Sequence, residues 1–390
     1  MRYLHLINDT LYTDFAVNIF EQCNPGNNTF LVGVKNADAP LKKTKQTNTI
    51  HIRKIRTKEY YQFIDSVDFD ILVVHFMHDY KAIAVNQLKK DVKIIWLVWG
   101  GDIRLTKTYN KNIYQPWTKK VVDGIRNSSA KRIRSGLRDF YYFLLTGSFP
   151  AAAFKKAVSK VDYCATVIPD EFDILCKEWD FFRDARVPFS YATIEDNFKN
   201  VGIDDYVDGN GILVGNSIDP SSNHFDALAK LKTLSITGRK IIVPLNYGEG
   251  MEYRDLLIKK GFEQFGDQFN PLQKMLPSAE YVKLLKSCDI ALMLHERQQA
   301  MGNIISLLWL GSKIFMSENS VVYTYLRRKG FHIYSFQTEL NNENINIRLT
   351  TEEVGTNRML LIKEYGEDVV LNKAKTLVNI VSGKAEANAN

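Results

Sequence analysis

The chain has 390 residues, of which 45% are hydrophobic and 24% are charged, and its formal net charge is +7. This composition excludes a disordered protein, a collagen and a small disulfide-bonded scaffold, and the length corresponds to roughly two or three average domains. No apolar run approaches the roughly 18 to 20 residues that span a bilayer. The N-terminal residues lack the apolar core of a signal peptide, and the four cysteines are widely spaced. We therefore expect a cytoplasmic protein with reduced thiols.

Strand and helix patterns alternate along the first half of the chain. Short continuous apolar runs, typical of strands buried on both faces, are separated by amphipathic segments with helical spacing. The predicted strands are Tyr3–Ile7, Thr29–Val34, Thr49–Arg53, Asp70–Phe76, Lys93–Trp99 and Val161–Thr166, and the predicted helices are Asp14–Cys23, Lys58–Val67, Tyr80–Lys90 and Pro169–Trp179. This alternation predicts a parallel sheet with helices on both faces.

A second alternation follows the irregular stretch Asn197–Asn210, which we interpret as a hinge. Its predicted strands are Gly211–Gly215, Lys240–Pro244, Asp289–Leu294 and Lys313–Met316, and its predicted helices are Ser222–Leu234, Met251–Lys260, Ser278–Ser287 and Gly302–Leu310. We therefore expect an α/β fold with two Rossmann-like domains, residues 1–200 and 201–390, facing across a cleft. This is the GT-B architecture of glycosyltransferases that use nucleotide sugars, although a fold alone does not establish a function.

A basic segment interrupts the first alternation. Between Arg104 and Arg138 the chain has ten lysine or arginine residues and one acid, Asp123, and the apolar run Phe140–Leu145 follows. Cations beside bulky apolar groups are typical of a segment that binds an anionic membrane surface. The alternative is a solvated basic surface beside the buried face of a helix. A nucleic-acid partner is disfavoured because no recognisable nucleic-acid-reading motif accompanies the charges.

Small and polar residues follow the first strand of the second alternation. In an open α/β sheet the ligand lies beyond the carboxyl ends of the strands, where small residues let backbone amides approach a phosphate. Gly215, Asn216 and Ser217 have this position, and His224 lies on the following helix. The alternative is a polar turn that caps that helix.

Two further polar segments follow later strands of the same alternation. Glu296–Asn303 offers a cation and two amides beside a glycine at a helix start, a combination that suits a diphosphate. Its candidate residues are Arg297, Gln298, Gln299, Gly302 and Asn303. After the next strand, Glu318 and Asn319 are candidates for contact with ribose hydroxyls. Each segment also has a structural interpretation, as first-turn residues or as a helix N-cap.

In the first domain, the strand ending at Trp99 continues into Gly100, Gly101 and Asp102. A carboxylate at this position could deprotonate an acceptor hydroxyl, so Asp102 is the leading candidate for a catalytic base. His75 and His78 follow the neighbouring strand and are the next candidates. The alternatives are helix capping by Asp102 and structural roles for both histidines.

Two motifs are rejected. Asp68-Phe-Asp70 matches a metal-binding pattern of A-type glycosyltransferases, and Gly209-Asn-Gly211 resembles a phosphate loop, but both precede their strands. They therefore lie at the wrong end of a sheet for a ligand. The histidines show no metal-ligand spacing, and we expect neither a metal nor another cofactor.

Taken together, these segments resemble the bacterial TDP-N-acetylfucosamine:lipid II N-acetylfucosaminyltransferases of enterobacterial common antigen synthesis. The resemblance is strongest between Gly211 and Asn319, and Trp99–Asp102 is similar to a W-G-A-D segment of that family, with Gly101 in place of its alanine. The residues that carry it are Ile212–Ser217, Asn223, His224, Val243, Pro244, Tyr247, Arg297–Gln299, Gly302, Glu318, Asn319 and His75.

The resemblance implies a nucleoside-diphosphate sugar donor in the second domain and a polyprenyl-diphosphate-linked saccharide acceptor at the first. It also implies a peripheral enzyme of bacterial surface polysaccharide synthesis at the inner face of the cell membrane. The main hypothesis is therefore a transferase of an acetamido-deoxyhexose. The alternative is a non-catalytic protein that binds a nucleotide or a glycan.

Overall fold

The computed structural model describes residues 1–45, 50–105, 113–126, 136–137, 139–140, 142–144, 147–179, 186–191, 193–198, 202, 204–248 and 250–384. The chain forms two compact units, each built from separate segments. The first unit comprises Met1–Thr108, Ile133–Ala192 and Glu367–Asn390, and the second comprises Tyr109–Arg132 and Thr193–Gly366. A simple division at residue 200 would misplace two segments. Residues 109–132, from the basic segment, belong to the second unit, and residues 367–390 belong to the first.

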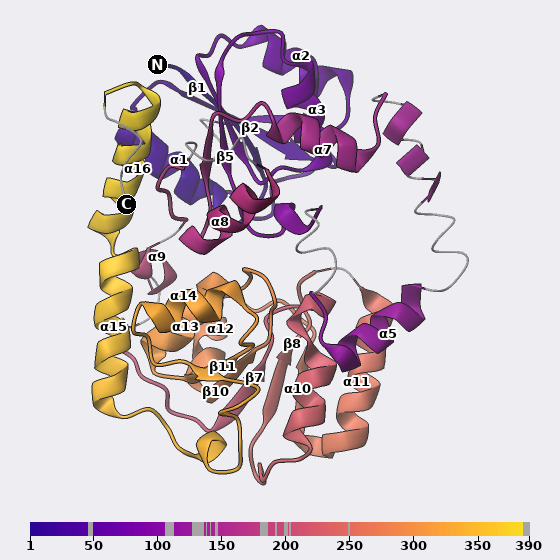
Figure 1. Ribbon diagram of the computed structural model, residues 1–390, viewed down its shortest axis with the longest axis vertical. Helices are drawn as coiled ribbons and strands as arrows, with labels where there is room; N and C mark the ends of the chain where they lie inside the picture. The colour runs from indigo at the N-terminus through magenta and orange to yellow at the C-terminus, as the bar shows by residue number, and fades with distance from the viewer. Residues whose placement is uncertain are drawn as a thin grey trace. The chain divides into compact units, whose positions relative to one another are not determined.

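The first unit is a six-stranded parallel sheet with the strand order β3-β2-β1-β4-β5-β6 (Figure 1). Its strands are β1 (Tyr3–Asn8), β2 (Asn28–Val34), β3 (Ile50–Lys54), β4 (Ile71–His75), β5 (Lys93–Leu97) and β6 (Tyr163–Ala165). Its helices are α1 (Thr13–Cys23), α2 (Lys58–Ser66), α3 (Asp79–Gln87), α7 (Pro150–Val158), α8 (Pro169–Glu178) and α16 (Glu367–Val381). The strand order reverses direction between β1 and β4, where such sheets bind ligands.

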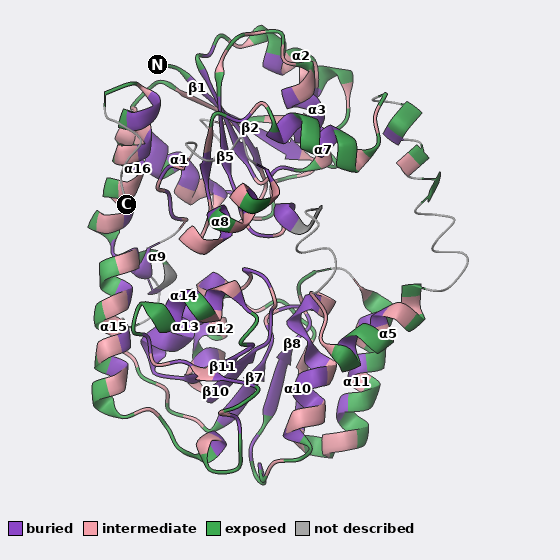
Figure 2. Cartoon of the chain, in the orientation of Figure 1, coloured by how far each residue is buried: buried purple, intermediate pink, exposed green. Residues whose placement is uncertain are grey.

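The core of the first unit depends on residues from both ends of the chain. Every residue of β4 is buried, as expected for a central parallel strand. Figure 2 shows that the neighbouring strand β5 is also mostly buried. On one face of the sheet, Val17 and Phe20 of α1 pack in the same cluster as Val370 and Leu377 of α16. The C-terminal helix is therefore part of the first hydrophobic core.

The second unit repeats this topology, with the strand order β12-β11-β10-β7-β8-β9, all parallel. Its strands are β7 (Gly211–Val214), β8 (Ile241–Pro244), β9 (Phe269–Leu272), β10 (Cys288–Met293), β11 (Lys313–Met316) and β12 (Tyr334–Ser335). Its helices are α5 (Pro116–Arg126), α9 (Ile194–Phe198), α10 (His224–Leu231), α11 (Met251–Phe265), α12 (Ser278–Lys286), α13 (Met301–Leu310), α14 (Val321–Arg328) and α15 (Thr351–Tyr365). Here the order reverses between β7 and β10.

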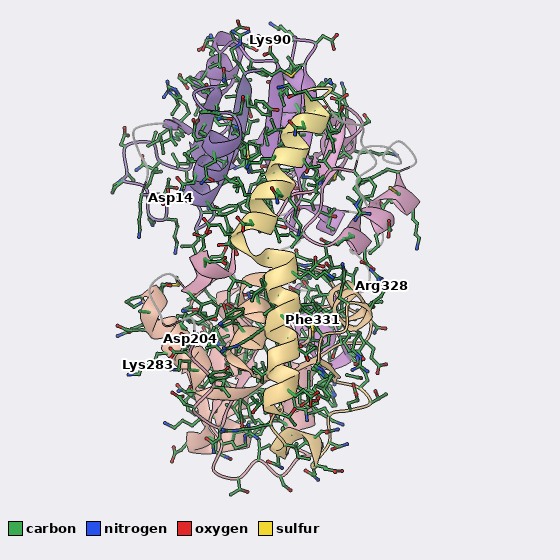
Figure 3. All side chains as sticks on the ribbon, turned by 90° about the vertical axis from the view of Figure 1, so that its left-hand side faces the viewer. Asp14, Lys90, Asp204, Lys283, Arg328 and Phe331 are labelled. Atoms are coloured by element: carbon green, nitrogen blue, oxygen red, sulfur yellow. The ribbon has the colours of Figure 1, made fainter. Side chains whose placement is uncertain are left out.

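Helix α15 covers part of the second unit by packing against α13. Arg358 of α15 donates a hydrogen bond to the carbonyl oxygen of Trp309 at 2.7 Å, and Asn357 accepts one from the amide of His332 at 2.8 Å. Figure 3 shows α15 with Phe331 beside it. Within the described residues, no helix combines the length and the apolar composition needed to cross a bilayer.

The predicted α/β class and the two Rossmann-like domains are confirmed. Every predicted strand and helix is present, with ends shifted by a few residues. Among the described residues, the strands and α-helices that the sequence patterns did not predict are β9, β12, α5, α7, α9, α14, α15 and α16. All four cysteines are free thiols, as expected.

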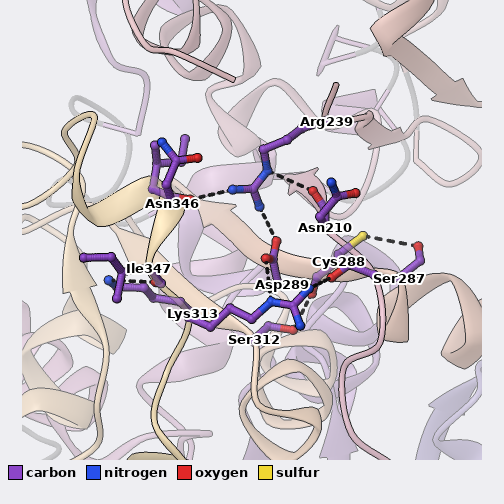
Figure 4. A network of polar contacts seen from close by, with 12 residues as sticks. Asn210, Arg239, Ser287, Cys288, Asp289, Ser312, Lys313, Asn346 and Ile347 are labelled. Carbon is purple, nitrogen blue, oxygen red and sulfur yellow. Dashed lines mark hydrogen bonds and ion pairs between the residues drawn. The ribbon is translucent and has the colours of Figure 1, made fainter. Parts of the chain in front are cut away.

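A buried ionic network holds the amino-terminal edge of the second sheet (Figure 4). Arg239, which is 6% exposed, pairs with Asp289, which is also 6% exposed. The Arg239 guanidinium also donates to the carbonyl oxygens of Asn210 at 2.8 Å and Ile345 at 2.6 Å, and Arg348 Nε donates to Asp289 at 3.1 Å. Both buried charges are therefore paired and hydrogen-bonded.

The same edge contains the rejected Gly209–Gly211 motif. The carbonyl oxygen of Gly209 accepts a hydrogen bond from Arg348, and a Cβ at this glycine would lie 2.3 Å from the carbonyl oxygen of Ser287. Lys313 at the start of β11 donates to the carbonyl oxygens of Asn344 and Ile347 at 3.0 and 3.2 Å. The glycines thus serve close backbone packing at the end of the sheet away from the ligand edge.

We expect Asp289→Ala to destabilise the second unit by about 3–5 kcal/mol, because it leaves the buried Arg239 charge without its partner. The measurement is the free energy of unfolding from urea denaturation. Lys260→Ala is the matched control, since its pair with Glu263 is half exposed on both sides. Such surface pairs contribute no more than about 1 kcal/mol. Equal effects of the two substitutions would contradict the assigned role of this network.

Candidate functional site

The candidate site lies where the strand order of the second sheet reverses. We call the segments that follow β7 and β10, residues 215–223 and 294–303, the edge loops. Gly215 opens the first of them with φ +67°, and a Cβ there would lie 2.8 Å from His224 Nε2 and 2.9 Å from Ser222 Cβ. A side chain is excluded both by the left-handed backbone and by the start of α10. The predicted small residue therefore lets α10 begin directly against the end of β7.

Two buried polar residues shape the first edge loop. Asn223, in the left-handed conformation at φ +54°, donates from Nδ2 to the carbonyl oxygen of Leu294 at 2.6 Å. This bond ties the start of α10 to the end of β10. Asp219 accepts from the Ser221 amide at 2.9 Å. Burial acts to raise the pKa of Asp219, but the hydrogen bonds from Ser221 and the charge of Arg297 outweigh it and lower that pKa.

Side chains of the two edge loops are joined in one hydrogen-bonded network. Gln299 Nε2 donates to Asn216 Oδ1 at 3.2 Å, and Gln299 Oε1 accepts from Ser221 Oγ at 2.7 Å. Arg297, which is 9% exposed, donates to Ser221 Oγ at 3.4 Å and to the carbonyl oxygen of Gln298 at 3.1 Å. The structure thus brings together Asn216, Arg297 and Gln299, as their positions after neighbouring strands predict.

His295 belongs to this network, although it was not among the predicted residues. Its Nε2 donates to Asn216 Oδ1 at 3.0 Å, and its side chain is 1% exposed. Burial, together with the nearby Arg297 charge, lowers the pKa of His295 to about 3, so the ring is neutral at neutral pH. In that tautomer Nδ1 is a hydrogen-bond acceptor. His295 lies two residues after β10, and this position in the sequence could have marked it as a candidate site residue.

Glu296 was quoted within the predicted segment but was not assigned a role. Its Oε1 accepts from Gln115 Nε2 and from Ser317 Oγ, each at 2.8 Å. Burial raises the pKa of Glu296 above its ordinary value. Among the described residues, Glu296 Oε2 has no hydrogen-bond partner, and neither do Gln298 Oε1 and His295 Nδ1. Buried polar atoms normally have partners, so these three atoms are candidates for contact with a ligand.

The remaining predicted residues flank the edge loops. Tyr247 follows β8 and is 65% exposed, whereas Glu318 follows β11 and accepts from Thr338 Oγ1 at 2.7 Å and from Ser335. These hydrogen bonds lower the pKa of Glu318. The strands β8 and β11 lie on opposite sides of the β7–β10 pair, roughly 14 Å apart at three strand spacings. Tyr247 and Glu318 are therefore placed to contact different parts of an extended ligand.

Polar residues at the start of α13 and after β11 differ in their surroundings. Asn303 donates to the Tyr281 hydroxyl at 2.8 Å, a bond between α13 and α12. Gly302 occupies the first turn of α13, whose N-cap, Ala300, is left-handed at φ +63°. Asn319 is exposed after β11. Gly302 and Asn319 thus remain accessible at the edge, whereas the Asn303 side chain is engaged within the unit.

Part of the basic segment docks beside the edge loops. We call its described residues 113–126, which include α5, the arm. Asp226 caps the start of α5 by accepting from the amides of Trp117 and Thr118, each at 2.9 Å. Asn223 Oδ1 accepts from the Gln115 amide at 2.8 Å, and Val122 is buried in the core of the second unit. The docked arm therefore places the Gln115 side chain where it donates a hydrogen bond to Glu296.

In the first unit, Asp102 is 4% exposed and fully hydrogen-bonded. Its Oδ2 accepts from the Met77 amide at 3.0 Å and from Trp96 Nε1 at 2.8 Å, and its Oδ1 accepts from the Trp99 amide at 3.1 Å. Burial raises the pKa of this carboxyl group. In this geometry Asp102 fixes the segments that follow β4 and β5. Its burial leaves it little access to an acceptor hydroxyl in this geometry.

The two candidate histidines of the first unit differ in exposure. His75 is fully buried, with Nε2 3.0 Å from His5 Nδ1 and Nδ1 2.7 Å from the Tyr191 hydroxyl. Burial lowers the pKa of His75 well below its ordinary value. These contacts and this burial favour the structural role that was the alternative for His75. His78 is exposed at the start of α3, with its ring 4.3 Å from that of Phe76.

The rejected Asp68-Phe-Asp70 motif lies at the amino-terminal end of β4, as its order in the sequence predicts. Arg2 forms an ion pair with Asp68, and the Arg2 amide donates to Asp70 at 2.8 Å. These carboxylates therefore help to join the starts of β1 and β4.

The two parallel sheets define a GT-B fold, and the family match supports a glycosyltransferase that depends on a nucleotide sugar. More particularly, residues 189–356 match the family described as 4-alpha-L-fucosyltransferase, glycosyl transferase group 56. The match covers the edge loops and is consistent with the resemblance predicted from the sequence.

Similar solved structures share the fold over the whole chain. The N-terminal domain of trehalose-6-phosphate phosphatase from Candida albicans is 11% identical with a TM-score of 0.65, covering 98% of this chain and 97% of that one. The alpha,alpha-trehalose 6-phosphate synthase of Burkholderia multivorans is 8% identical with a TM-score of 0.63, covering 100% of both. A glycosyltransferase from Rickettsia africae ESF-5 is 10% identical with a TM-score of 0.61, covering 98% and 100%.

We expect Gly215→Ala to destabilise the protein more than Gly238→Ala. Both glycines have a positive φ, +67° and +75°, so both substitutions impose roughly 1–2 kcal/mol of backbone strain. Only Gly215 has atoms within 3 Å of the added Cβ, whereas Gly238 has none within 4 Å. Overpacking should add about 1–3 kcal/mol. Urea denaturation measures the difference, and equal losses would show that α10 can move away from β7.

We expect buried neutral His224 to make the protein less stable in mild acid. Burial lowers the pKa of His224 from 6.5 to about 4, so below pH 6.5 the unfolded chain binds a proton that the folded chain does not. The stability that depends on this group should fall by about 2 kcal/mol between pH 7 and pH 5. Urea denaturation at both values should show a smaller loss for His224→Gln. His332→Gln, at a side chain that is 38% exposed, is the control and should leave the loss unchanged.

Proposed function

We propose that this glycosyltransferase moves an acetamido-deoxyhexose from a nucleoside-diphosphate donor to a lipid-linked saccharide in bacterial surface polysaccharide synthesis. The observation that carries the donor assignment is the network of Asn216, Ser221, Arg297 and Gln299, which joins the loops after β7 and β10. This is the position at which an open parallel sheet binds its ligand. The donor itself is the substrate, and the proposal invokes no metal or other cofactor.

The chemistry of the edge loops suits a diphosphate in their centre. Arg297 brings a buried cation, and the start of α13 adds the positive end of a helix dipole. The Gly215 backbone can approach an anion closely because it has no Cβ. Charge-assisted hydrogen bonds to phosphate are stronger than neutral ones. Arg297 would therefore stabilise the diphosphate both when it is bound and when it departs from the sugar.

The flanking residues suit the two ends of the donor. The exposed ring of Tyr247, after β8, offers a surface for stacking a base, whereas the carboxylates of Glu296 and Glu318 lie toward β11. An extended nucleotide sugar placed across the edge would meet both groups. Glu318 is oriented for hydroxyl contact by Thr338 and Ser335.

In the first unit we assign acceptor contact to the carboxyl-terminal edge of β4 and β5. His78 is the exposed candidate there for accepting a proton from an acceptor hydroxyl. Asp102 supports it indirectly, because its hydrogen bond from the Met77 amide fixes the residue before His78. Buried His75 acts within the core of the unit.

Exposed apolar side chains support a membrane-surface role for the first unit. Phe143 stacks on Phe149 with ring centroids 4.9 Å apart, and Tyr142 anchors this region in a cluster with Ile83 and Ala153. The exposed apolar residues of this region are Leu137, Phe140, Phe143, Leu144 and Phe149. Their exposure does not fit the alternative that Phe140–Leu145 is only a buried helix face. The predicted cations Lys131, Arg132, Arg134 and Arg138 lie outside the described residues.

We expect Arg297→Ala to weaken nucleoside-diphosphate binding by about 1.5–3 kcal/mol, the usual contribution of a charge-assisted hydrogen bond. Isothermal titration calorimetry with dTDP, UDP and GDP measures the loss. Arg328→Ala is the matched control, since Arg328 is exposed at the end of α14 (Figure 3) and should bind as the unchanged protein does. Binding that is insensitive to Arg297→Ala would remove the diphosphate from the edge loops.

We expect the protein to bind vesicles that contain anionic lipid and to release them at high salt, because basic residues near the surface each contribute on the order of 1 kcal/mol. Changing Leu137, Phe140 and Leu144 to Ser should weaken this binding in a sedimentation assay. The control changes Leu256 and Phe262 of α11, which are also exposed but belong to the second unit. No binding to anionic vesicles, or equal loss in both variants, would contradict the assignment of this surface.

A further inference from the structure

We propose that Glu296 recognises the sugar of the donor and that Gln115 of the arm positions it for this task. The inference rests on the proposed donor site and adds a specificity-determining residue to it. Glu296 lies three residues after β10 and directly precedes Arg297, the residue assigned to the diphosphate. The other carboxylate of the edge loops, Asp219, accepts hydrogen bonds from the Ser221 amide and hydroxyl.

The two oxygens of Glu296 have different surroundings. Oε1 accepts two hydrogen bonds, from Gln115 Nε2 and Ser317 Oγ, each at 2.8 Å. Oε2 is buried and has no partner among the described residues. A buried carboxylate oxygen without a donor is costly, and two donors on the other oxygen prevent the group from turning to satisfy it. A ligand that donates a hydrogen bond to Oε2 would remove this cost.

The neighbouring free atoms narrow the chemistry of that ligand. Neutral His295 has an acceptor at Nδ1, and Gln298 has one at Oε1, both buried and without partners among the described residues. All three free atoms accept hydrogen bonds. Each of them can accept a hydrogen bond from a ligand rich in donors, such as a pyranose with hydroxyls or an amide N–H. They do not complement phosphate oxygens, which accept hydrogen bonds and carry negative charge.

Among the parts of a nucleotide sugar, the transferred sugar fits this set better than the ribose. Glu318 already offers a carboxylate toward β11, is exposed, and has one oxygen held by Thr338 and Ser335. Glu296 is less exposed and lies next to Arg297. Hydrogen bonds that a substrate donates to buried acceptors discriminate strongly between substrates, because a sugar that lacks the matching hydroxyl leaves these acceptors unpaired. We therefore assign Glu296 to the sugar and leave Glu318 to the ribose.

Gln115 acts through Glu296 as a positioning residue. It comes from the arm, whose placement depends on hydrogen bonds from the Gln115 amide to Asn223 and from the start of α5 to Asp226. Loss of its side-chain amide would leave Oε1 with only the bond from Ser317 and allow the carboxylate to turn. Sugar recognition is thus linked to the docking of the arm.

The test compares nucleoside diphosphates with their sugars by calorimetry, using UDP and UDP-N-acetylglucosamine, dTDP and dTDP-glucose, and GDP and GDP-fucose. For the pair that the unchanged protein binds, Glu296→Gln should weaken the nucleotide sugar about tenfold or more and leave the nucleoside diphosphate within about twofold. Gln115→Ala should show the same pattern with a smaller change. Glu263→Gln, on the exposed surface of α11, is the control and should change neither.

Each other outcome has a definite meaning. Equal weakening of the diphosphate and its sugar by Glu296→Gln would assign the carboxylate to the nucleotide and overturn the inference. No change in either would overturn it as well, with the donor site still intact. If the unchanged protein binds none of the six compounds, the proposed donor site itself fails. Should Glu296→Gln not fold, as judged by thermal unfolding, Gln115→Ala decides alone, because it changes no residue of the edge loops.

Discussion

The close approach of β7, α10 and β10 is the constraint on which the second unit depends. Gly215 leaves no room for a Cβ, and Asn223 bonds across to the carbonyl oxygen of Leu294. These two contacts bring the loops after β7 and β10 near enough for Asn216 to meet both His295 and Gln299. The arm then uses the other side of Asn223, through its Oδ1. One asparagine thus organises the edge loops, the start of α10 and the arm.

The two ends of the second sheet differ in how their charges are satisfied. At the amino-terminal edge, Arg239, Asp289 and Arg348 satisfy one another and nearby carbonyl groups. At the carboxyl-terminal edge, acceptors of His295, Glu296 and Gln298 have no partner among the described residues. A buried network that is complete stabilises the fold, whereas one that is incomplete suits a ligand. This contrast supports the proposed placement of the donor site at the carboxyl-terminal edge.

Local pattern predicted most of the fold, and it also led to the proposed donor site. The continuous apolar run of β4 and the glycine after β7 are signals that a few neighbouring residues carry, and both predictions hold in the structure. β9 was missed because it is a short edge strand whose sequence, Phe269-Asn-Pro-Leu272, alternates poorly and contains a proline.

Other features depend on residues that are distant in sequence, which local pattern does not reveal. Burial of His75 follows from His5 on β1 and from Tyr191. The carboxylate of Asp102 is engaged by the amides of Met77 and Trp99 and by the indole of Trp96. The docking of the arm follows from Asp226, more than a hundred residues further along the chain. In each of these three examples a tertiary contact determines the role of the residue. The spacing of apolar residues along the chain does not reveal such a contact.

The placement of α16 has a consequence for synthesis of the chain. The first hydrophobic core packs Val370 and Leu377, which are synthesised after the second unit, against Val17 and Phe20, which are synthesised before it. Until α16 emerges from the ribosome, α1 covers that face of the first sheet only in part. Exposed apolar surface favours aggregation. The first unit therefore completes folding only after the second has been synthesised. A fragment that ends near residue 200 would lack one wall of its own core.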